Sequence, residues 1–364
     1  MMKNNEISIY IHIPFCERKC DYCAFVSFCV NRKEEDKYVY YLTKEMENFK
    51  TSKVVKTIYI GGGTPSILSI ENLKKIFYTL KSNFKIKKDA EITIEVNPNS
   101  LSEEKLFEYK NLGINRISIG VQSLNNDTLK KIGRLHNKDE AIKSIKLASK
   151  YFDNISADLI IGLENEKDVY KYVETLIKLG VKHISAYMLE IHENTPIFEK
   201  FNSQKYLPLN EEEVANEYEK LVEYLEKKNF HQYEVSNFAL SGYESRHNLN
   251  YWNFGEYIGF GISAHSYING KRVANANTLK EYFNGVKFQD ENNSKTEIEE
   301  RIFLGLRCIL GVDLKVLDKL GYKMQNNENY QMFVKKGILF EKGDRVYLNK
   351  KYYLVSDFVI SHLL

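Results

Sequence analysis

Residues 6–25 read EISIYIHIPFCERKCDYCAF and join an apolar segment to a group of cysteines. The apolar half, EISIYIHI over residues 6–13, is rich in β-branched side chains and predicts a buried β-strand. A Pro-Phe turn ends this strand. Cys16, Cys20 and Cys23 are therefore predicted to lie on the loop that follows its carboxyl end.

Further apolar segments follow the first one, with amphipathic stretches between them. Strands are predicted at 55–60, 90–96, 114–121, 155–163 and 181–189, and helices at 34–50, 70–83, 102–112, 138–150, 167–179 and 210–230. Six β-α units in a row imply an α/β fold with a parallel sheet and right-handed crossovers. Such a sheet either curls into a barrel or stays open in a doubly wound fold. In a barrel, the loops at the carboxyl ends of the strands carry the chemistry, which includes the cysteine loop.

The rest of the chain departs from this pattern. Residues 231–289 fit neither period and are predicted to be an irregular extension that carries HNLNYW (247–252), with a polar linker around 283–296. Helical stretches and a hairpin in the last part of the chain predict a small winged-helix-like α+β domain; they lie at 297–310, 327–336, 337–350 and 356–364. The predicted domains are 1–230, 231–289 and 290–364.

The amino-acid composition and the net charge indicate the class of protein. The 364 residues are 43% hydrophobic and 28% charged, which is typical of a globular protein of about two domains. The net charge of +3 gives no pull toward nucleic acid, and no nucleic-acid partner is expected. No segment resembles a secretory signal or approaches the roughly 20 apolar residues of a membrane span. We therefore expect a cytoplasmic protein with at most peripheral membrane association, and a homodimer stays open.

Three of the five cysteines lie within eight positions. In a reducing compartment such a group indicates a metal site more often than a disulfide. A short loop with three thiolates can bind three irons of a [4Fe–4S] cluster and leave the fourth iron open to a small molecule. The alternative is a zinc site that His12, His136 or another distant ligand completes, although zinc sites favour paired Cys-x₂-Cys knuckles.

CERKCDYC (16–23) resembles the C-x₃-C-x-φ-C motif of the radical S-adenosylmethionine (SAM) enzymes, with Tyr22 at the aromatic position. Other segments resemble the oxygen-independent coproporphyrinogen III oxidases and the heme chaperones related to them: YIHIPFC, GGGTPS, EVNPNSL, RISIGVQSLN, DLIIGL and YEVSNFA with GYESRHNLNYW. The resemblance runs from about Ile7 to the C-terminus. It implies a partial (β/α)₆ TIM-type barrel of the radical SAM type.

The resemblance also implies roles for individual residues. Cys16, Cys20 and Cys23 would ligate the [4Fe–4S] cluster, and the amino and carboxylate groups of SAM would chelate the fourth iron. The positions that match SAM contacts in the family are Tyr10, Tyr22, Gly62, Gly63, Thr64, Glu95, Gln122, Arg134 and Asp158.

The residues themselves leave alternatives to these SAM contacts. Gly61 to Gly63 end a predicted strand, where glycine lets the backbone approach a ligand closely or simply forms a tight turn. Glu95, Gln122 and Asp158 lie at or within predicted strands, where a buried polar group needs a partner. That partner is either SAM or a neighbouring core residue. Three such groups on different strands favour a ligand.

Two functions from different classes are compatible with the resemblance. One is an oxidase that uses a 5′-deoxyadenosyl radical to decarboxylate propionates of coproporphyrinogen III. The other is a heme chaperone that keeps the SAM-binding barrel, carries heme as cargo and delivers it to acceptors such as respiratory enzymes. Phe25 stands where the oxidases have a further cysteine, only 15 residues precede Cys16 where the oxidases have a longer extension, and HNLNYW matches the chaperone branch. These features favour the chaperone without oxidase activity.

His247 in HNLNYW is the candidate heme ligand, because histidine is a common axial ligand of heme iron. The alternative is that His247 orders its segment through hydrogen bonds and packing. His265 and His12 are weaker candidates. Cys29 and Cys308 are expected to be free cysteines rather than ligands.

Overall fold

The computed structural model describes residues 5–29, 31–290 and 294–364. Its main body is a twelve-stranded sheet in the order β14-β13-β12-β11-β1-β4-β5-β6-β7-β8-β10-β9. Six parallel strands form the centre, each paired with the next. They are β1 (Glu6–Ile13), β4 (Val54–Gly62), β5 (Ile86–Val96), β6 (Arg116–Gln122), β7 (Asn154–Ile161) and β8 (His183–Met188). The six predicted strands and their parallel order are confirmed.

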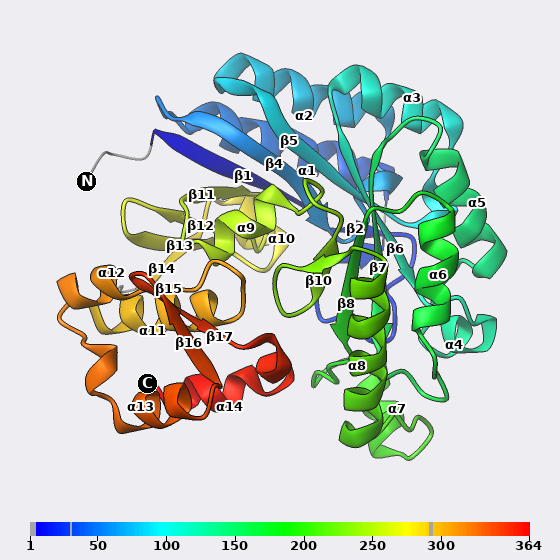
Figure 1. Ribbon diagram of the computed structural model, residues 1–364. Coiled ribbons are helices and arrows are strands. Elements are labelled where there is room, and N and C mark those ends of the chain that lie inside the picture. The colour runs from blue at the N-terminus through cyan, green and yellow to red at the C-terminus, as the bar shows by residue number, and fades with distance from the viewer. Residues whose placement is uncertain (1–4, 30, 291–293) are drawn as a thin grey trace.

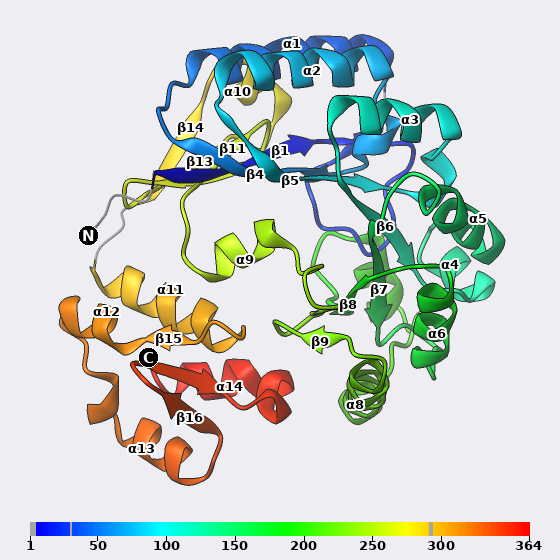
Figure 2. The ribbon, with the colours of Figure 1, turned by 45° about the horizontal axis from the view of Figure 1, so that its top comes forward.

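Helices cover the outer face of this curved sheet, and α1 and α2 lie over β1, β4 and β5 (Figures 1 and 2). The helices are α1 (Arg32–Asn48), α2 (Ile70–Asn83), α3 (Glu103–Leu112), α4 (Asn126–Lys131), α5 (Lys138–Ala148), α6 (Tyr170–Lys178), α7 (Pro196–Asn202) and α8 (Glu211–Lys227). The six predicted helices are confirmed. The short helices α4 and α7 were not predicted, because six or seven residues are too few to show a helical period.

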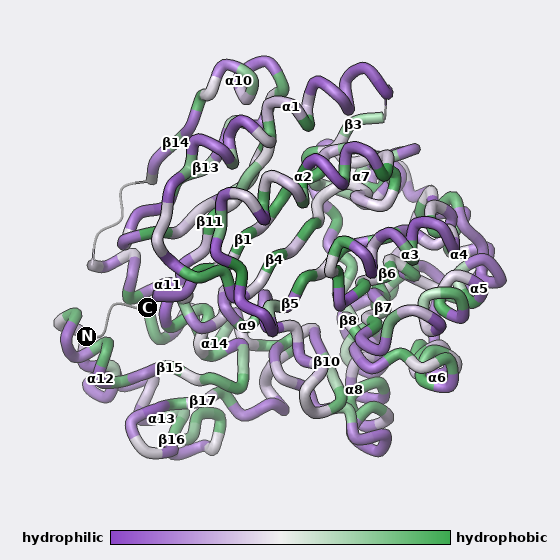
Figure 3. The backbone as a smooth tube through the Cα atoms, turned by 90° about the horizontal axis from the view of Figure 1, so that it is seen from above, coloured by the Kyte–Doolittle hydropathy of each residue, from purple (hydrophilic) through white to green (hydrophobic). Residues whose placement is uncertain are grey.

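Each central strand has an apolar outer face and a more polar inner face. In β1, the four isoleucines belong to the main hydrophobic core, while Ser8, Tyr10 and His12 alternate with them and face the interior. Figure 3 shows α1 as mostly hydrophilic above the more hydrophobic β1 and β4. The inner face therefore differs from the doubly apolar strands of most parallel sheets. It gives the barrel an interior that suits a polar ligand.

The prediction of an irregular extension over residues 231–289 is wrong, because these residues add strands to both edges of the sheet. Antiparallel pairing joins β10 to β8, and parallel pairing joins β11 to β1. The elements are β9 (His231–Gln232), β10 (Asn237–Ala239), α9 (Arg246–Trp252), β11 (Tyr257–Phe260), β12 (His265–Ile268), β13 (Lys271–Asn275), α10 (Leu279–Phe283) and β14 (Lys287–Asp290). Strands of two to five residues are too short for a clear alternation.

The predicted polar linker is also largely structured. β14 pairs with β13, and the next helix begins at Ser294, so only residues 291–293 of this stretch lie outside the described residues. Between the two sheet extensions, α9 lies on the side of β1 and β4 opposite to α1 and α2 (Figure 2). This position places α9 inside the concave face of the half-barrel.

The C-terminal part has a hydrophobic core of its own. It contains α11 (Ser294–Leu306), β15 (Val312–Asp313), α12 (Leu314–Lys319), α13 (Glu328–Lys335), β16 (Leu339–Lys342), β17 (Arg345–Leu348) and α14 (Ser356–Ser361). The predicted helices and hairpin are present, and β15 joins the hairpin in a three-stranded sheet. A β-bridge between Glu234 and Cys308 and the ion pair of Arg272 with Glu300 join this part to the barrel. The winged-helix-like description and the domain boundaries stay predictions. Within the described ranges, every helix is too short or too polar to cross a membrane.

Candidate iron–sulfur and cofactor site

The three clustered cysteines share one loop at the carboxyl end of β1. Cys16 lies in β2 (Phe15–Cys16), which pairs with β3 (Phe28–Cys29), and the chain between these strands carries Cys20 and Cys23. Cys16 is buried, and the other two are half-buried. All three line one cavity of about 480 Å³, within the range of about 300–1,000 Å³ that small-molecule sites occupy.

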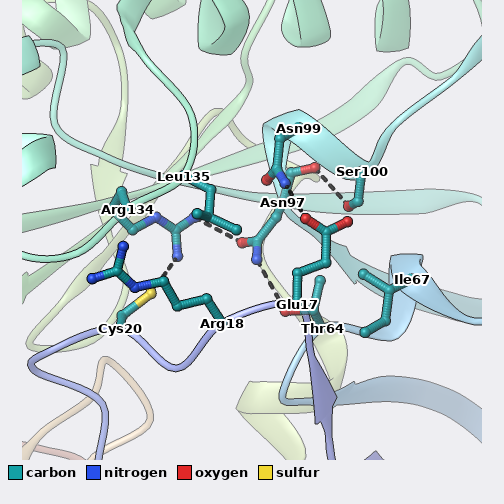
Figure 4. A pocket seen from close by; sticks show the side chains of 10 residues that line it. All are labelled: Glu17, Arg18, Cys20, Thr64, Ile67, Asn97, Asn99, Ser100, Arg134 and Leu135. Atoms are coloured by element: carbon teal, nitrogen blue, oxygen red, sulfur yellow. Dashed lines mark hydrogen bonds between the residues drawn. The ribbon is translucent and has the colours of Figure 1, made fainter. Parts of the chain in front are cut away.

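Two of the cysteine sulfurs accept hydrogen bonds from neighbouring side chains. Thr64 Oγ1 donates to Cys16 Sγ and Arg134 Nη1 donates to Cys20 Sγ, each over 3.4 Å. Asn97 joins the two donors: its Nδ2 donates to Thr64 Oγ1 over 3.0 Å, and its Oδ1 accepts from Arg134 Nη2 over 2.7 Å. Figure 4 shows the part of this chain that runs from Cys20 through Arg134 and Asn97 to Thr64. Donors that orient sulfur ligands are typical of metal centres.

The loop fits a [4Fe–4S] cluster better than a single metal ion. Among the residues that the structure describes, no three His, Cys, Asp or Glu side chains converge on one ion position. A cubic cluster places its three cysteines on three separate irons, so its ligands need not converge in that way. Burial raises the pKa of the Cys16 and Cys23 thiols, and a bound cationic centre would offset that cost.

The zinc alternative finds no support in His12 and His136, the two histidines that were named as ligands that could complete such a site. His12 Nδ1 pairs with the Tyr10 hydroxyl over 3.0 Å, and its Nε2 pairs with the Val26 carbonyl over 3.0 Å. His136 Nε2 donates to the Val121 carbonyl over 3.0 Å. These contacts hold both rings in the protein interior. The three cysteines, the sulfur donors and the open cavity are compatible with a cluster, and the ligand role of the three cysteines stays a prediction.

Eight of the nine positions that match SAM contacts line the cysteine cavity. They come from the cysteine loop and from the carboxyl ends or following loops of four central strands: Tyr22, Gly62, Gly63, Thr64, Glu95, Gln122, Arg134 and Asp158. Gln122 adopts a φ of 66°, where the register between β6 and β7 shifts. Such a conformation is uncommon outside glycine and is concentrated at functional sites. The geometry thus brings these residues together, and their individual contacts with SAM stay predictions.

Tyr10 is the exception, because it does not line this cavity. Its ring stacks against Tyr59 with a centroid separation of 6.3 Å, and its hydroxyl pairs with His12. Tyr59 lines the cavity and donates to Glu95 Oε1 over 2.7 Å. Tyr10 therefore supports the wall of the cavity from behind, and the expected direct SAM contact is not visible in this arrangement.

Glu95 and Asp158 bring two carboxyl groups into the cavity. Burial raises the pKa of Glu95 to about 7 and is opposed by the Tyr59 hydroxyl and by the Gly62 N–H, which donates over 3.1 Å. Burial also raises the pKa of Asp158, whose oxygens accept from the Ser118 hydroxyl over 3.1 and 3.2 Å. Both groups are poised for a ligand that donates hydrogen bonds or carries positive charge.

The raised pKa of Glu95 predicts a pH-dependent stability of the ligand-free protein. In the folded state the Glu95 carboxyl keeps its proton up to about pH 7, whereas its ordinary pKa is 4.5. Between these two pH values the unfolded state releases the proton and the folded state does not, so the folded state loses stability as pH rises. Glu95→Gln cannot ionise. Relative to wild type, we expect the free energy of unfolding of Glu95→Gln to rise by roughly 2 kcal/mol between about pH 4.5 and pH 8. This value is smaller than the full pKa shift implies, because the side chain is partly exposed to solvent. Urea unfolding at both pH values measures the gain, and a difference that is the same at both would contradict the assignment.

Several cavity residues were missed from the sequence. They lie on the inner faces of the central strands, in a loop beside them or in α9: Tyr59, Asn97, Arg116, Ser118, Ser185, Tyr187 and Asn248. A signal for the strand positions was present, since polar residues alternate with apolar ones along 114–121 and 155–163. Alternation alone does not show whether the polar face meets solvent or a barrel interior.

His247 is buried, with 1% of its surface exposed, and does not line the cavity. Its Nδ1 pairs with Thr57 Oγ1 over 2.8 Å and its Nε2 with the Tyr251 hydroxyl over 2.8 Å. Burial lowers the pKa of the ring to about 3, so the ring is neutral at physiological pH. Since both nitrogens have partners, the geometry favours the alternative in which His247 orders α9 against β4. It does not support the expected heme-ligand role.

Replacing His247 should therefore affect stability more than heme spectra. His247→Ala leaves the Tyr251 hydroxyl without its buried partner and removes one of the two partners of the Thr57 hydroxyl, which still donates to Ser8 Oγ. We expect a loss of about 1–3 kcal/mol in the free energy of unfolding. The heme absorption maximum should not move. The exposed His265 offers a control, because His265→Ala should change stability by less than about 0.5 kcal/mol. A shifted heme spectrum in His247→Ala alone would restore the ligand role.

The remaining cysteines lie apart from the cavity. Cys29 is exposed in β3, and Cys308 is buried in the C-terminal part. Both are unpaired cysteines. Neither lines the cavity of the clustered cysteines. Their placement agrees with the expectation that they are not ligands.

The comparisons with known proteins agree with this geometry. The family model of the radical SAM superfamily matches residues 10–179. Among solved structures, coproporphyrinogen III oxidase (HemN) from Escherichia coli, described as a radical SAM enzyme, has a TM-score of 0.83 at 19% identity. The match covers 100% of this chain and 91% of that chain. At this identity the likeness shows the fold alone, and it confirms the expected α/β barrel of the radical SAM type.

Curated relatives identify the branch. The heme chaperone HemW of Bacillus subtilis (strain 168) is 38% identical over 98% of this chain and 99% of its own length. The heme chaperone HemW of Lactococcus lactis (strain IL1403) is 33% identical over 98% and 97%, and that of E. coli (strain K12) is 37% identical over 73% and 71%. Agreement over nearly whole chains includes both the cysteine loop and the C-terminal part. The chain therefore belongs to the HemW family of the radical SAM superfamily.

Proposed function

We propose that this protein is a heme chaperone that binds heme and delivers it to acceptor proteins. The observation that carries the proposal is the 38% identity to a heme chaperone over almost the full length of both chains. The cavity supports it, because apolar and aromatic side chains line it together with polar ones. They include Phe25, Ile160, Tyr187, Met188 and Leu189.

Cys16, Cys20 and Cys23 would hold a [4Fe–4S] cluster in the same cavity, with one iron open to SAM. When bound, the cluster and SAM together supply one-electron chemistry that protein side chains cannot perform. Thr64 and Arg134 orient the sulfurs of Cys16 and Cys20 through the hydrogen bonds described above. Glu95 and Asp158 would accept hydrogen bonds from polar groups of SAM.

Phe25 favours the chaperone function over the oxidase alternative. It stands where the oxidases have a further cysteine, and 68% of its surface is exposed at the cavity. An exposed aromatic ring at a cavity rim suits contact with a flat apolar ligand, and large exposed apolar groups mark interaction sites. The likeness to HemN is one of fold and does not favour the oxidase reaction. We therefore infer that the protein does not convert coproporphyrinogen III.

One preparation tests both functions. The cluster is reconstituted anaerobically, hemin is titrated while the Soret band is followed, and coproporphyrinogen III is then supplied with SAM and a reductant. We expect saturable heme binding and no protoporphyrinogen IX. Formation of protoporphyrinogen IX would overturn the proposal in favour of the oxidase. Transfer of bound heme to an apo-form heme protein, followed by the spectrum of the acceptor, tests delivery.

The heme acceptors, the cellular location and the oligomeric state of this protein are also proposals. Acceptors such as respiratory enzymes, a cytoplasmic location with at most peripheral membrane association, and a homodimer are compatible with the family. Sedimentation of the reconstituted protein with and without hemin measures the oligomeric state. Flotation with lipid vesicles measures membrane association.

A further inference from the structure

The cavity of the clustered cysteines has an exposed part that two loops form together. Its exposed polar and aromatic residues are Arg18, Lys19, Phe25, Tyr187, Glu190 and His192. The first three belong to the cysteine loop, and the others lie at the end of β8 or between β8 and α7. The two loops are in contact, because Ile197 N donates to the Asp21 carbonyl over 2.9 Å and Lys200 Nζ donates to Asp21 Oδ2 over 2.5 Å.

His192 lines this cavity, whereas the other histidines of the chain, all within the described ranges, do not. Its neighbours Leu189 and Ile191 pack against a small hydrophobic cluster of the barrel. Glu190 and His192 alternate with them and are exposed. Thr195 Oγ1 donates to the His192 carbonyl over 2.6 Å, which fixes the backbone of this turn. The loop therefore presents the imidazole both to the cavity and to solvent.

The imidazole of His192 is paired with a carboxylate. Its Nε2 lies 3.2 Å from Glu190 Oε2, and 50% of its side-chain surface is exposed. With the proton on Nε2, the ring donates to the carboxylate and keeps a lone pair on Nδ1. Among the described residues, no hydrogen bond occupies Nδ1. A carboxylate that accepts from one ring nitrogen raises the basicity of the other, and metal-bound histidines usually have such a partner.

The buried histidines of the barrel do not offer a free nitrogen to this cavity. His12, His183 and His247 each have partners on both ring nitrogens. His136 is buried and does not line the cavity. The three cysteines of the cavity are the predicted ligands of the cluster. His192 is therefore the nitrogen ligand that the cavity leaves available to an iron.

The residues around His192 match the other parts of a heme, which is a flat apolar ring with propionate groups. Phe25 and Tyr187 are 68% and 45% exposed, and aromatic rings stack on flat ligands. Arg18 and Lys19 are exposed cations, which suit carboxylates. The exposed part of the cavity thus provides an iron ligand, aromatic surface and counter-charge for one ligand.

We propose that His192 binds the iron of heme as an axial ligand and that Glu190 orients its ring. The inference rests on the proposed function, because heme is the ligand. It places heme at the exposed part of the cavity, beside the cysteine loop, rather than at the buried His247. An exposed site suits a cargo that is handed on to another protein.

Two porphyrins separate iron ligation from general binding. Hemin and metal-free protoporphyrin IX are titrated into reconstituted wild type, His192→Ala, Glu190→Gln and Phe25→Ala. We expect His192→Ala to lose more than about 10-fold in hemin affinity, since loss of an outer partner alone has effects of that size on metal affinity. Its affinity for metal-free protoporphyrin should equal that of wild type. Glu190→Gln should weaken hemin binding by a smaller factor, and Phe25→Ala should weaken both porphyrins, because stacking does not need the iron.

Absorption spectra and free imidazole identify the ligand directly. The Soret maximum of bound hemin should shift in His192→Ala, and added imidazole should restore the wild-type spectrum. His265→Ala is the matched control, because His265 is also exposed but does not line the cavity. It should bind hemin with wild-type affinity and spectrum. Iron and sulfide content and the midpoint of thermal unfolding should be the same in His192→Ala as in wild type, since a surface substitution changes stability little.

The possible outcomes distinguish this inference from the proposed function. Saturable hemin binding by wild type, with the same affinity and spectrum in His192→Ala, overturns the inference and leaves the heme chaperone proposal intact. Equal weakening of both porphyrins in His192→Ala also overturns it, because the side chain then contacts the ring and not the iron. If wild type binds neither porphyrin, the proposed function fails and the inference fails with it.

Discussion

Cys16→Ala is expected to lose the iron–sulfur cluster almost completely, while Cys29→Ala and Cys308→Ala keep it. Cys16 is buried at the cavity, and its sulfur already accepts a hydrogen bond from Thr64. With three protein ligands, the loss of one thiolate leaves an iron without a protein bond. Iron and acid-labile sulfide are measured after anaerobic reconstitution, together with the visible absorption of the cluster.

Cys29 is a stringent control for this experiment. Its Cα pairs in register with that of Cys16 between β2 and β3, yet its side chain is exposed and outside the cavity. A cluster lost in Cys29→Ala would show that the ligand set has been assigned wrongly. Cys308 tests a distant position in the C-terminal part. Full iron and sulfide in Cys16→Ala would refute the three-cysteine site itself.

Gly63→Ala is expected to remove most of the cluster and to weaken SAM binding, although it adds only one methyl group. A Cβ at Gly63 would lie 2.7 Å from the Phe15 carbonyl oxygen and 3.0 Å from Cys16 Sγ. The backbone cannot yield easily, because Gly63 N donates to the Ile13 carbonyl over 2.8 Å and Thr64 N to the Phe15 carbonyl over 2.7 Å. Overpacking of this kind costs about 1–3 kcal/mol, and here it displaces a ligand cysteine.

Gly113→Ala provides the matched control. Gly113 ends α3 with a φ of 97°, and nothing lies within 4 Å of a Cβ built there. Its substitution should cost about 1 kcal/mol through backbone strain and leave the cluster unchanged. Cluster content and the midpoint of thermal unfolding are measured for both variants. Wild-type iron and sulfide content in Gly63→Ala would show that β2 and the segment around Gly63 are not packed as closely as described.

Local patterns in the sequence determined the centre of the fold. The six strands and the helices between them were predictable because each has its own apolar period, and parallel order follows from their alternation. The cysteine loop was predictable because its three residues are close along the chain. The resemblance then named the polar residues at the strand ends, and all of these except Tyr10 line one cavity.

Only the tertiary structure decided how distant segments meet. β10 and β11 join opposite edges of one sheet, and their few residues carry no period that reveals either partner. The burial of His247 and of Arg116 depends on side chains from other parts of the chain. The physical reason is that hydrophobic period is a local property, whereas strand pairing and the pairing of buried polar groups depend on residues far apart in the chain.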